Sequence, residues 1–142
     1  MRPETPALTA DIIIEMIDRH NNPIVLIERK NPPFGWALPG GFVDIGESVQ
    51  QAAVREAQEE VCLQVNLITL LGIYSDPARD PRGHTASAVY IAQASGQPRA
   101  ADDAANVHIY PFNSLPTELA FDHQSILDDY RVYRETGRFP KL

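Results

Sequence analysis

The chain has 142 residues with 12 Lys or Arg and 19 Asp or Glu, which gives a formal net charge of −7. This acidic balance argues against a broad nucleic-acid-binding surface. It does not exclude a small anionic substrate, because a bound metal ion can reverse the local field. With 44% hydrophobic and 22% charged residues, the composition is that of a folded domain, and we expect residues 1–142 to form a single domain.

Cysteine content and hydropathy indicate in which cellular compartment the protein is expected. Cys62 is the single cysteine, which excludes an intramolecular disulfide and a zinc site built from several cysteines. The first 16 residues contain prolines and acidic side chains without a long apolar core, and no apolar run approaches the ~20 residues of a membrane span. We therefore expect a cytoplasmic protein with no signal peptide and no contact with a membrane.

Local patterns predict the secondary structure in chain order. A loop rich in Pro and Gly is expected at 31–41, leading into a short strand, and a polar loop at 95–106. Gly137 is expected to end the last helix. The other expected elements are strands at 10–17 and 23–28, a helix at 48–62, strands at 65–73, 85–94 and 107–112, and a helix at 122–136. Several strands with two helices indicate a layered α/β domain.

The helix predicted at 48–62 carries an unusual charge pattern. Glu56, Glu59 and Glu60 stand at i, i+3 and i+4, so their carboxylates share one narrow arc of the helix. Like charges at this spacing repel each other, whereas a hard divalent cation such as Mg²⁺ takes carboxylate oxygens and keeps positions for water and substrate phosphate. A solvated acidic helix face is the alternative. The expected apolar stripe consists of Ala53, Val54, Ala57 and Val61.

The spacing of charged residues and glycines over 41–63, GFVDIGESVQQAAVREAQEEVCL, resembles the Nudix box, G-x5-E-x7-R-E-U-x-E-E-x-G-U, in which U is a bulky apolar residue. The matching positions are Gly41, Glu47, Arg55, Glu56, Glu59, Glu60 and Leu63. Ala57 is a small residue at the first apolar position. Cys62 replaces the final glycine, and a positive φ there would cost a non-glycine residue about 1 kcal/mol.

The resemblance implies a Nudix-type α/β/α sandwich with a mixed β-sheet and two main helices. It implies hydrolysis of a nucleoside diphosphate linked to a further group, with Mg²⁺, or Mn²⁺ in its place, as the cofactor. Glu56, Glu59 and Glu60 are the implied metal ligands, together with the backbone carbonyl of Gly40. Family members are often dimers, so the resemblance allows a homodimer, with 8–17 as the region to examine for an exchange between subunits.

Two box residues have open roles. Arg55 is adjacent to the carboxylates in sequence but off their arc, so we expect it to orient Glu47 or Glu59 rather than to contact phosphate; a plain surface ion pair is the alternative. Glu47 either caps the N-terminus of the helix, where a carboxylate meets the dipole favourably, or lies close to the metals as the resemblance implies. Both roles remain open at this point.

Substrate choice depends on residues outside the box. The segments 75–84, SDPARDPRGH, and 119–123, LAFDH, resemble those of the small bacterial and archaeal ADP-ribose pyrophosphatases, which implies ADP-ribose as substrate and AMP and ribose 5-phosphate as products. Arg79 and Arg82 offer forked donors suited to a diphosphate or to the terminal ribose. The alternative is a charged turn in which Asp76 and Asp80 pair with these arginines.

Three further positions are candidates. Trp36 either packs against an adenine or covers the edge of the core. Asp102 and Asp103, in the polar loop, are candidates for reaching the attacking water, with Asp103 preferred as general base and Asp102 also a candidate contact to the substrate. The alternative is that both are solvated loop carboxylates, and Glu59 is the rival base. Two other functions stay open: a (d)NTP house-cleaning pyrophosphatase, and a non-catalytic module that senses ADP-ribose. In each, the partner is a small nucleotide.

Overall fold

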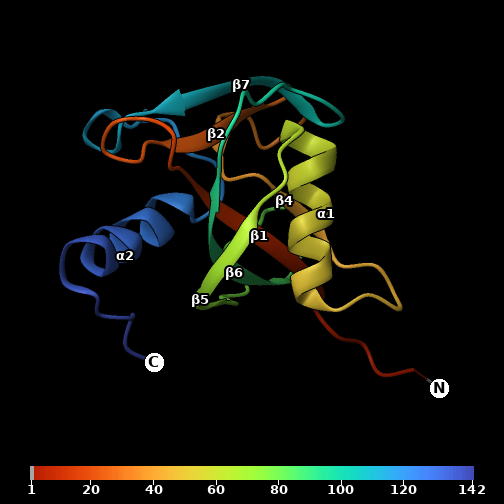
Figure 1. Cartoon of the computed structure of the whole chain (residues 1–142). Helices are drawn as coiled ribbons and strands as arrows, with labels where there is room; N and C mark the ends of the chain where they lie inside the picture. Colours follow the sequence, from red (N-terminus) through yellow and green to blue (C-terminus); the bar gives the residue numbers. More distant parts are fainter. Residues whose placement is uncertain (1) are drawn as a thin grey trace.

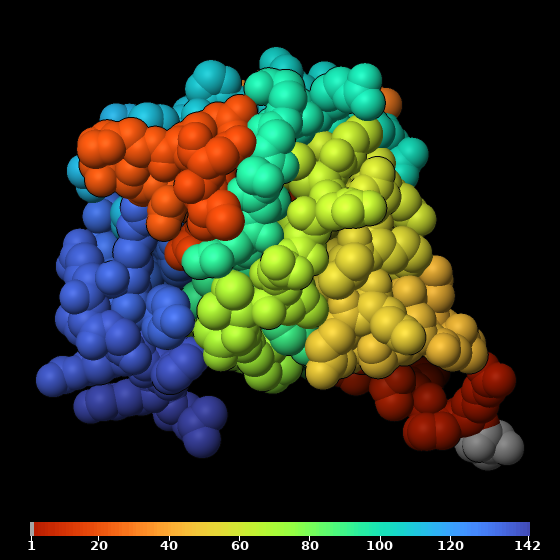
Figure 2. Space-filling view, in the orientation of Figure 1, coloured from red at the N-terminus to blue at the C-terminus, as the bar shows by residue number. Residues whose placement is uncertain are grey.

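The computed structural model describes residues 2–142 and has one mixed sheet between two helices (Figure 1). The elements in chain order are β1 (Ala7–Met16), β2 (Ile24–Arg29), β3 (Trp36–Ala37), β4 (Gly40–Phe42), α1 (Val49–Val61), β5 (Asn66–Tyr74), β6 (Thr85–Ala94), β7 (Ala104–Tyr110), a 3₁₀ turn (Phe112–Ser114) and α2 (His123–Thr136). Figure 2 shows α1, in yellow, and α2, in blue, on opposite sides of the molecule. The expected α/β sandwich is confirmed.

The sheet has β1 at its centre. Its strand order is β3-β2-β1-β6-β5, with β4 paired to β1 and β7 paired to β2. The β1–β6 pair is parallel and runs over ten residues of each strand, while the other pairs are antiparallel. Because β1 is paired on both sides, it is an interior strand and not a free arm.

The period-2 alternation of β1 supplies both halves of the core. Its even-numbered residues from Ala10 to Met16 belong to the cluster that also contains the buried residues of α1. Ile13 faces the other way and packs with Ile126, Leu127 and Tyr130 of α2. The odd-numbered face therefore looks toward α2, and the two hydrophobic layers hold the helices on opposite faces of one strand.

Three local expectations need correction. Val54 is 41% exposed, and Ala52 takes the buried place on α1 that was expected for it. Glu47 does not cap α1, because Ser48 is the N-cap residue and forms a capping box with Gln51. The strand expected at 107–112 runs instead from Ala104 to Tyr110, because β7 pairs with β2 from Arg29 back to Ile24. Gly137 ends α2 with φ 76°, as expected.

The pairing of β1 creates the opening in which the site lies. Near its end β1 pairs with β2, at Glu15 and Ile24, but over Thr9–Asp11 it pairs with β4. The strands β1 and β2 therefore separate toward the start of β1, and β4 lies beside β1 there. Backbone from three strands thus surrounds one space at this edge of the sheet.

Candidate active site

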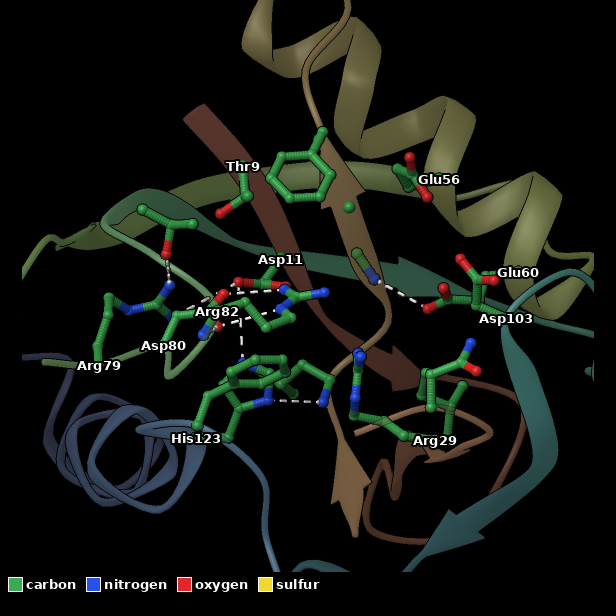
Figure 3. A pocket seen from close by; sticks show the side chains of 18 of the residues that line it. Thr9, Asp11, Arg29, Glu56, Glu60, Arg79, Asp80, Arg82, Asp103 and His123 are labelled. Atoms are coloured by element: carbon green, nitrogen blue, oxygen red, sulfur yellow. Dashed lines mark hydrogen bonds and ion pairs between the residues drawn. The ribbon is translucent and has the colours of Figure 1, made fainter. Parts of the chain in front are cut away.

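A pocket of about 270 Å³ opens where β1, β2 and β4 separate. Its acidic lining residues are Asp11, Asp44, Glu56, Glu60, Asp80 and Asp103, and its basic ones are Arg29, Arg79 and Arg82. Figure 3 shows Glu56, Glu60 and Asp103 on one side of this space, with Arg82 on the opposite side and Arg29 below. The pocket therefore combines an acidic wall with a basic one.

Glu60 is the most deeply buried carboxylate of the box. It is 5% exposed, and its Oε1 accepts a hydrogen bond from the backbone N–H of Gly40 at 3.1 Å. Burial raises the pKa of Glu60 to about 8, and the nearby carboxylate of Glu56 adds to this effect, while the Gly40 bond opposes it. Burial disfavours the ionised form of this carboxyl group, so a bound cation that pairs with the carboxylate would stabilise that form.

Glu56 lies against the glycine that opens the box. A Cβ atom added at Gly41 would meet the Glu56 carboxylate at 2.5 Å, so a side chain at this position would displace that carboxylate from its place in the pocket wall. Burial raises the pKa of Glu56, against the hydrogen bond from Arg55. The close approach of bare backbone to this carboxylate explains why glycine starts the motif.

Arg55 forms hydrogen-bonded ion pairs with three glutamates of the box. Its guanidinium donates to Glu47 Oε1 at 2.6 Å, to Glu56 Oε1 at 2.9 Å and to Glu59 Oε2 at 3.0 Å. It also donates to the backbone carbonyl of Phe42, and its hydrogen bonds lower the pKa of Glu47 to about 2. Arg55 thus orients both glutamates considered for it and ties α1 to the end of β4.

The three glutamates of the arc do not all line the pocket. Glu56 and Glu60 belong to its wall, whereas the side chain of Glu59 is 46% exposed and bonds to Arg55. Among residues 2–142, no three His, Cys, Asp or Glu side chains converge as a ready-made metal site. The donor set still suits a hard cation, because two largely buried carboxylates face the pocket beside the Gly40 backbone.

The two arginines of the 75–84 segment have different surroundings. Arg79 is 8% exposed; its guanidinium bonds to Asp122 at 3.0 and 2.7 Å and to Thr85 Oγ1 at 2.7 Å. Arg82 pairs with Asp80 at 2.8 Å, while its side chain stays 44% exposed. Arg79 is therefore held mainly by protein groups, with Asp122 rather than Asp76 as its partner, and Arg82 is the more accessible of the two.

Two expected substrate contacts lie elsewhere. Trp36 packs edge-on against Tyr110 and His108, at centroid distances of 5.3 and 6.4 Å, and is outside the pocket lining. Asp103 lines the pocket and Asp102 does not. Asp102 has a positive φ of 49°, and its backbone carbonyl accepts a hydrogen bond from Lys30. The geometry favours the core-covering role for Trp36 and singles out Asp103 in the loop.

Several pocket residues, among them Arg29 and Phe121, were not singled out from the sequence. Arg29 and Arg82 lie over the ring of Phe121, with 4.8 and 5.1 Å from each guanidinium carbon to the ring centroid. Phe121 has φ 56°, a costly conformation for a bulky residue. Burial lowers the pKa of Arg29, and the charge of Arg82 adds to this, so the two cations are close enough to repel.

A buried polar group joins the floor of the pocket to α2. The N–H of Leu38 donates to His123 Nδ1 at 3.0 Å, which places the ring proton on Nε2 in the neutral form. Burial lowers the pKa of His123. Its Nε2 lies 3.8 Å from Asp11 Oδ2, and Ser87 donates to the same oxygen at 2.5 Å. His123 and Asp11 are thus largely buried groups of the pocket lining, held by protein partners.

Comparisons with known proteins agree with this geometry. The chain is 49% identical over 132 residues to the ADP-ribose pyrophosphatase of Methanocaldococcus jannaschii, covering 91% of this chain and 75% of that protein. A MutT/nudix family protein from Enterococcus faecalis superposes with a TM-score of 0.80 at 31% identity, over 94% of this chain and 64% of the other.

A further solved structure contains a nucleotide. The NUDIX domain of Shewanella oneidensis NrtR, complexed with ADP ribose, superposes with a TM-score of 0.78 at 28% identity, over 94% of this chain and 90% of that one. The NUDIX domain family matches residues 6–130, which include the whole box and every side chain that lines the pocket. The chain therefore belongs to the NUDIX domain family.

Proposed function

We propose that the chain is a Mg²⁺-dependent pyrophosphatase that hydrolyses ADP-ribose to AMP and ribose 5-phosphate. One observation carries the proposal: a single pocket has the carboxylates of Glu56 and Glu60 on one wall and the guanidinium of Arg82 on another. A metal-bound diphosphate needs this combination, because the cation takes carboxylates and the remaining phosphate charge takes arginine. The 49% identical relative from Methanocaldococcus jannaschii bears the name of this activity.

Glu56 and Glu60 would hold the metal, with the Gly40 carbonyl beside them and Glu59 joining after its exposed side chain turns from Arg55. Bound Mg²⁺, or Mn²⁺, would polarise the phosphoryl oxygens and neutralise the charge that develops on the leaving phosphate. The residues around the metal would hold its ligands in place and exclude water. Arg55 keeps Glu47 and Glu56 in place, and the buried position of Glu60 excludes water from one side of its carboxylate.

The substrate would lie with its diphosphate between the two walls. Arg82 and Arg29 would bind phosphate oxygens, with Phe121 fixing the direction of both guanidinium groups. Asp103 would accept a proton from the attacking water, whose oxygen forms a new bond to one phosphorus while the bridging P–O bond breaks. The products are AMP and ribose 5-phosphate, and the bridging oxygen leaves with the departing phosphate. Glu59 is the rival base.

Two other functions give different results in one assay. A (d)NTP house-cleaning enzyme would turn over dGTP at least as fast as ADP-ribose, whereas a sensing module would bind ADP-ribose without turnover. We expect kcat/KM for ADP-ribose to exceed that for dGTP, with activity lost in EDTA. Glu60→Gln should lose about 100-fold or more in kcat, while Glu135→Gln, an exposed position on α2, serves as the matched control.

Three wider expectations accompany the proposal. Within residues 2–142, no helix is long and apolar enough to cross a membrane, and a cytoplasmic location remains a prediction. A homodimer also remains a prediction, to be measured by light scattering during gel filtration. If a dimer forms, an exchange of 8–17 would have to break the ten-residue pairing of β1 with β6, so we expect contact through other surfaces.

A further inference from the structure

The loop that carries Asp103 is fastened to the end of α1. The last carbonyl groups of a helix have no partner within the helix and need one elsewhere. Here the Glu60 carbonyl accepts a hydrogen bond from the backbone N–H of Ala101, and the Val61 carbonyl accepts one from Arg99, both at 3.0 Å. Because the Glu60 side chain lies in the acidic wall of the pocket, its backbone joins a proposed metal ligand to the loop of the proposed base.

A tight turn at the end of this loop directs Asp103 to the pocket. Asp102 and Asp103 form its corner, and the N–H of Ala104 closes it by donating to the carbonyl of Ala101 at 3.1 Å. Asp102 has φ 49°, a backbone conformation that costs a residue with a side chain about 1 kcal/mol. Such a conformation persists where surrounding contacts hold it.

Lys30, the residue after β2, contacts both corner residues. Its ammonium donates to the carbonyl of Asp102 at 2.6 Å, and its backbone N–H donates to the carbonyl of Asp103 at 3.3 Å. The first bond is short and has a charged donor, which makes it stronger than a bond between neutral groups. Lys30 therefore holds the turn from the end of β2, while α1 holds the loop that precedes the turn.

The placement of Lys30 makes it a support for the turn and not a contact to substrate. Arg29 and Asn31 line the pocket, whereas Lys30 between them does not, and its side chain is exposed. Figure 3 shows Asp103 beside Glu60 at the acidic wall. A general base must lie within hydrogen-bond reach of the water that it activates, and a displacement of about 1 Å can lower the rate about 100-fold.

We propose that Lys30 is a positioning residue, which holds the turn at 101–104 so that the Asp103 carboxylate faces the attacking water. The assignment rests on the proposed function, in which Asp103 accepts the proton of that water. Lys30 acts through the backbone of Asp102 and does not touch the substrate. Without its ammonium, the Asp102 carbonyl bonds to solvent and the turn is free to move, which misaligns Asp103 and leaves its charge in place.

The first test removes the ammonium and keeps most of the side-chain stem. Lys30→Met should lower kcat for ADP-ribose about five- to tenfold and leave KM within about twofold, because substrate binding does not depend on the base. Lys30→Arg keeps a cationic donor and should stay within about twofold of the wild type in kcat. Lys141→Met, at the exposed end of the chain, is the matched control. A raised KM with an unchanged kcat would overturn the assignment by making Lys30 a substrate contact.

A double-mutant cycle separates positioning from a general effect on the structure. Asp103→Asn has no base to align, so adding Lys30→Met to it should change kcat less than about twofold. The same loss in both backgrounds would overturn the assignment, because Lys30 would then act independently of Asp103. Full activity of Asp103→Asn alone would also overturn it, since the turn would then carry no base.

Hydrogen exchange measured by NMR reports on the turn without any turnover. The N–H of Ala104 closes the turn, so its exchange should become at least about threefold faster in Lys30→Met and stay unchanged in Lys141→Met. An unchanged rate in Lys30→Met would contradict the hold of Lys30 on the turn. Wild-type protein that binds ADP-ribose but does not hydrolyse it would refute the proposed activity and the alignment of a base, even where faster exchange shows that Lys30 holds the turn.

Discussion

Arg79 and Asp122 form a two-armed ion pair, with Nε to Oδ2 at 3.0 Å and Nη2 to Oδ1 at 2.7 Å. The Arg79 side chain is 4% exposed and that of Asp122 21%. Arg79 belongs to the loop before β6, and Asp122 immediately precedes α2, so the pair ties the start of that helix to the pocket wall. The two segments that resemble ADP-ribose pyrophosphatases are therefore joined to each other directly.

Breaking this pair should destabilise the fold. Arg79→Ala leaves the Asp122 carboxylate without its partner in a largely buried place, and we expect a loss of about 3 kcal/mol in the free energy of unfolding. Urea denaturation measures it, with Arg138→Ala, an exposed position after α2, as control. Unchanged stability together with lost substrate binding would instead restore Arg79 as a direct contact to substrate.

The pKa of Glu60 predicts how stability depends on pH in the metal-free protein. Burial raises this pKa from 4.5 to about 8, so between these values the folded state holds a proton that the unfolded state has lost. The contribution of Glu60 is therefore favourable at pH 4 and is lost as the pH rises toward 8. In EDTA, Glu60→Gln should raise the Tm at pH 8 relative to the wild type and change it less at pH 5. Equal Tm differences at the two pH values would contradict the buried, proton-holding state.

Metal binding should show the opposite dependence on pH. A cation can use Glu60 only after the proton leaves, so the rise in Tm on adding Mg²⁺ should be larger at pH 8.5 than at pH 6. Glu60→Gln should reduce this rise, and Glu135→Gln should leave it unchanged. A rise in Tm that is the same at both pH values would place the metal away from Glu60.

The loop between β6 and β7 offers two adjacent carboxylates for a direct comparison. Asp103 lines the pocket and Asp102 does not. If Asp103 accepts the proton of the attacking water, Asp103→Asn should lower kcat about 100-fold or more, while Asp102→Asn stays within a few-fold of the wild type. A strong loss in Glu59→Gln, with Asp103→Asn nearly as active as the wild type, would transfer the role of base to Glu59.

Cys62 predicts a gain in stability. It ends α1 in the left-handed region with φ 59°, where glycine has no steric penalty and other residues pay about 1 kcal/mol. Cys62→Gly should therefore raise the free energy of unfolding by about 0.5–1 kcal/mol without changing kcat. Cys62→Ala is the matched control and should show no gain, since alanine has the same penalty. Equal stabilities of the two variants would remove backbone strain as the explanation.

The sequence predicted the helix of the box and its end well, because both depend on local signals. Glu56 and Glu60 stood out by their helical spacing, whereas Arg55 and the positive φ at Cys62 followed from the resemblance to the Nudix box. By their helical spacing the three glutamates are alike, yet Glu59 turns to Arg55 while Glu60 is buried. A helical wheel gives the angle of a side chain but not the layer that covers it.

The remaining pocket residues depend on contacts between distant strands. Asp11 and Thr9 enter the site because β1 pairs with β4 at this point, and Arg29 enters because β2 diverges from β1 there. Phe121 is brought over by α2, and its left-handed backbone has no signal in the residue type. Trp36 was a reasonable candidate by composition, but the edges of Tyr110 and His108 enclose it.

The identity of the products formed from ADP-ribose tests the central claim most directly. Purified protein incubated with ADP-ribose and Mg²⁺ should release AMP and ribose 5-phosphate in equal amounts, as separated by ion-exchange chromatography. The same mixture in EDTA, and the Glu60→Gln variant, should release neither above background. Binding of ADP-ribose without any release of AMP, or hydrolysis of dGTP at an equal or higher kcat/KM, would contradict the account.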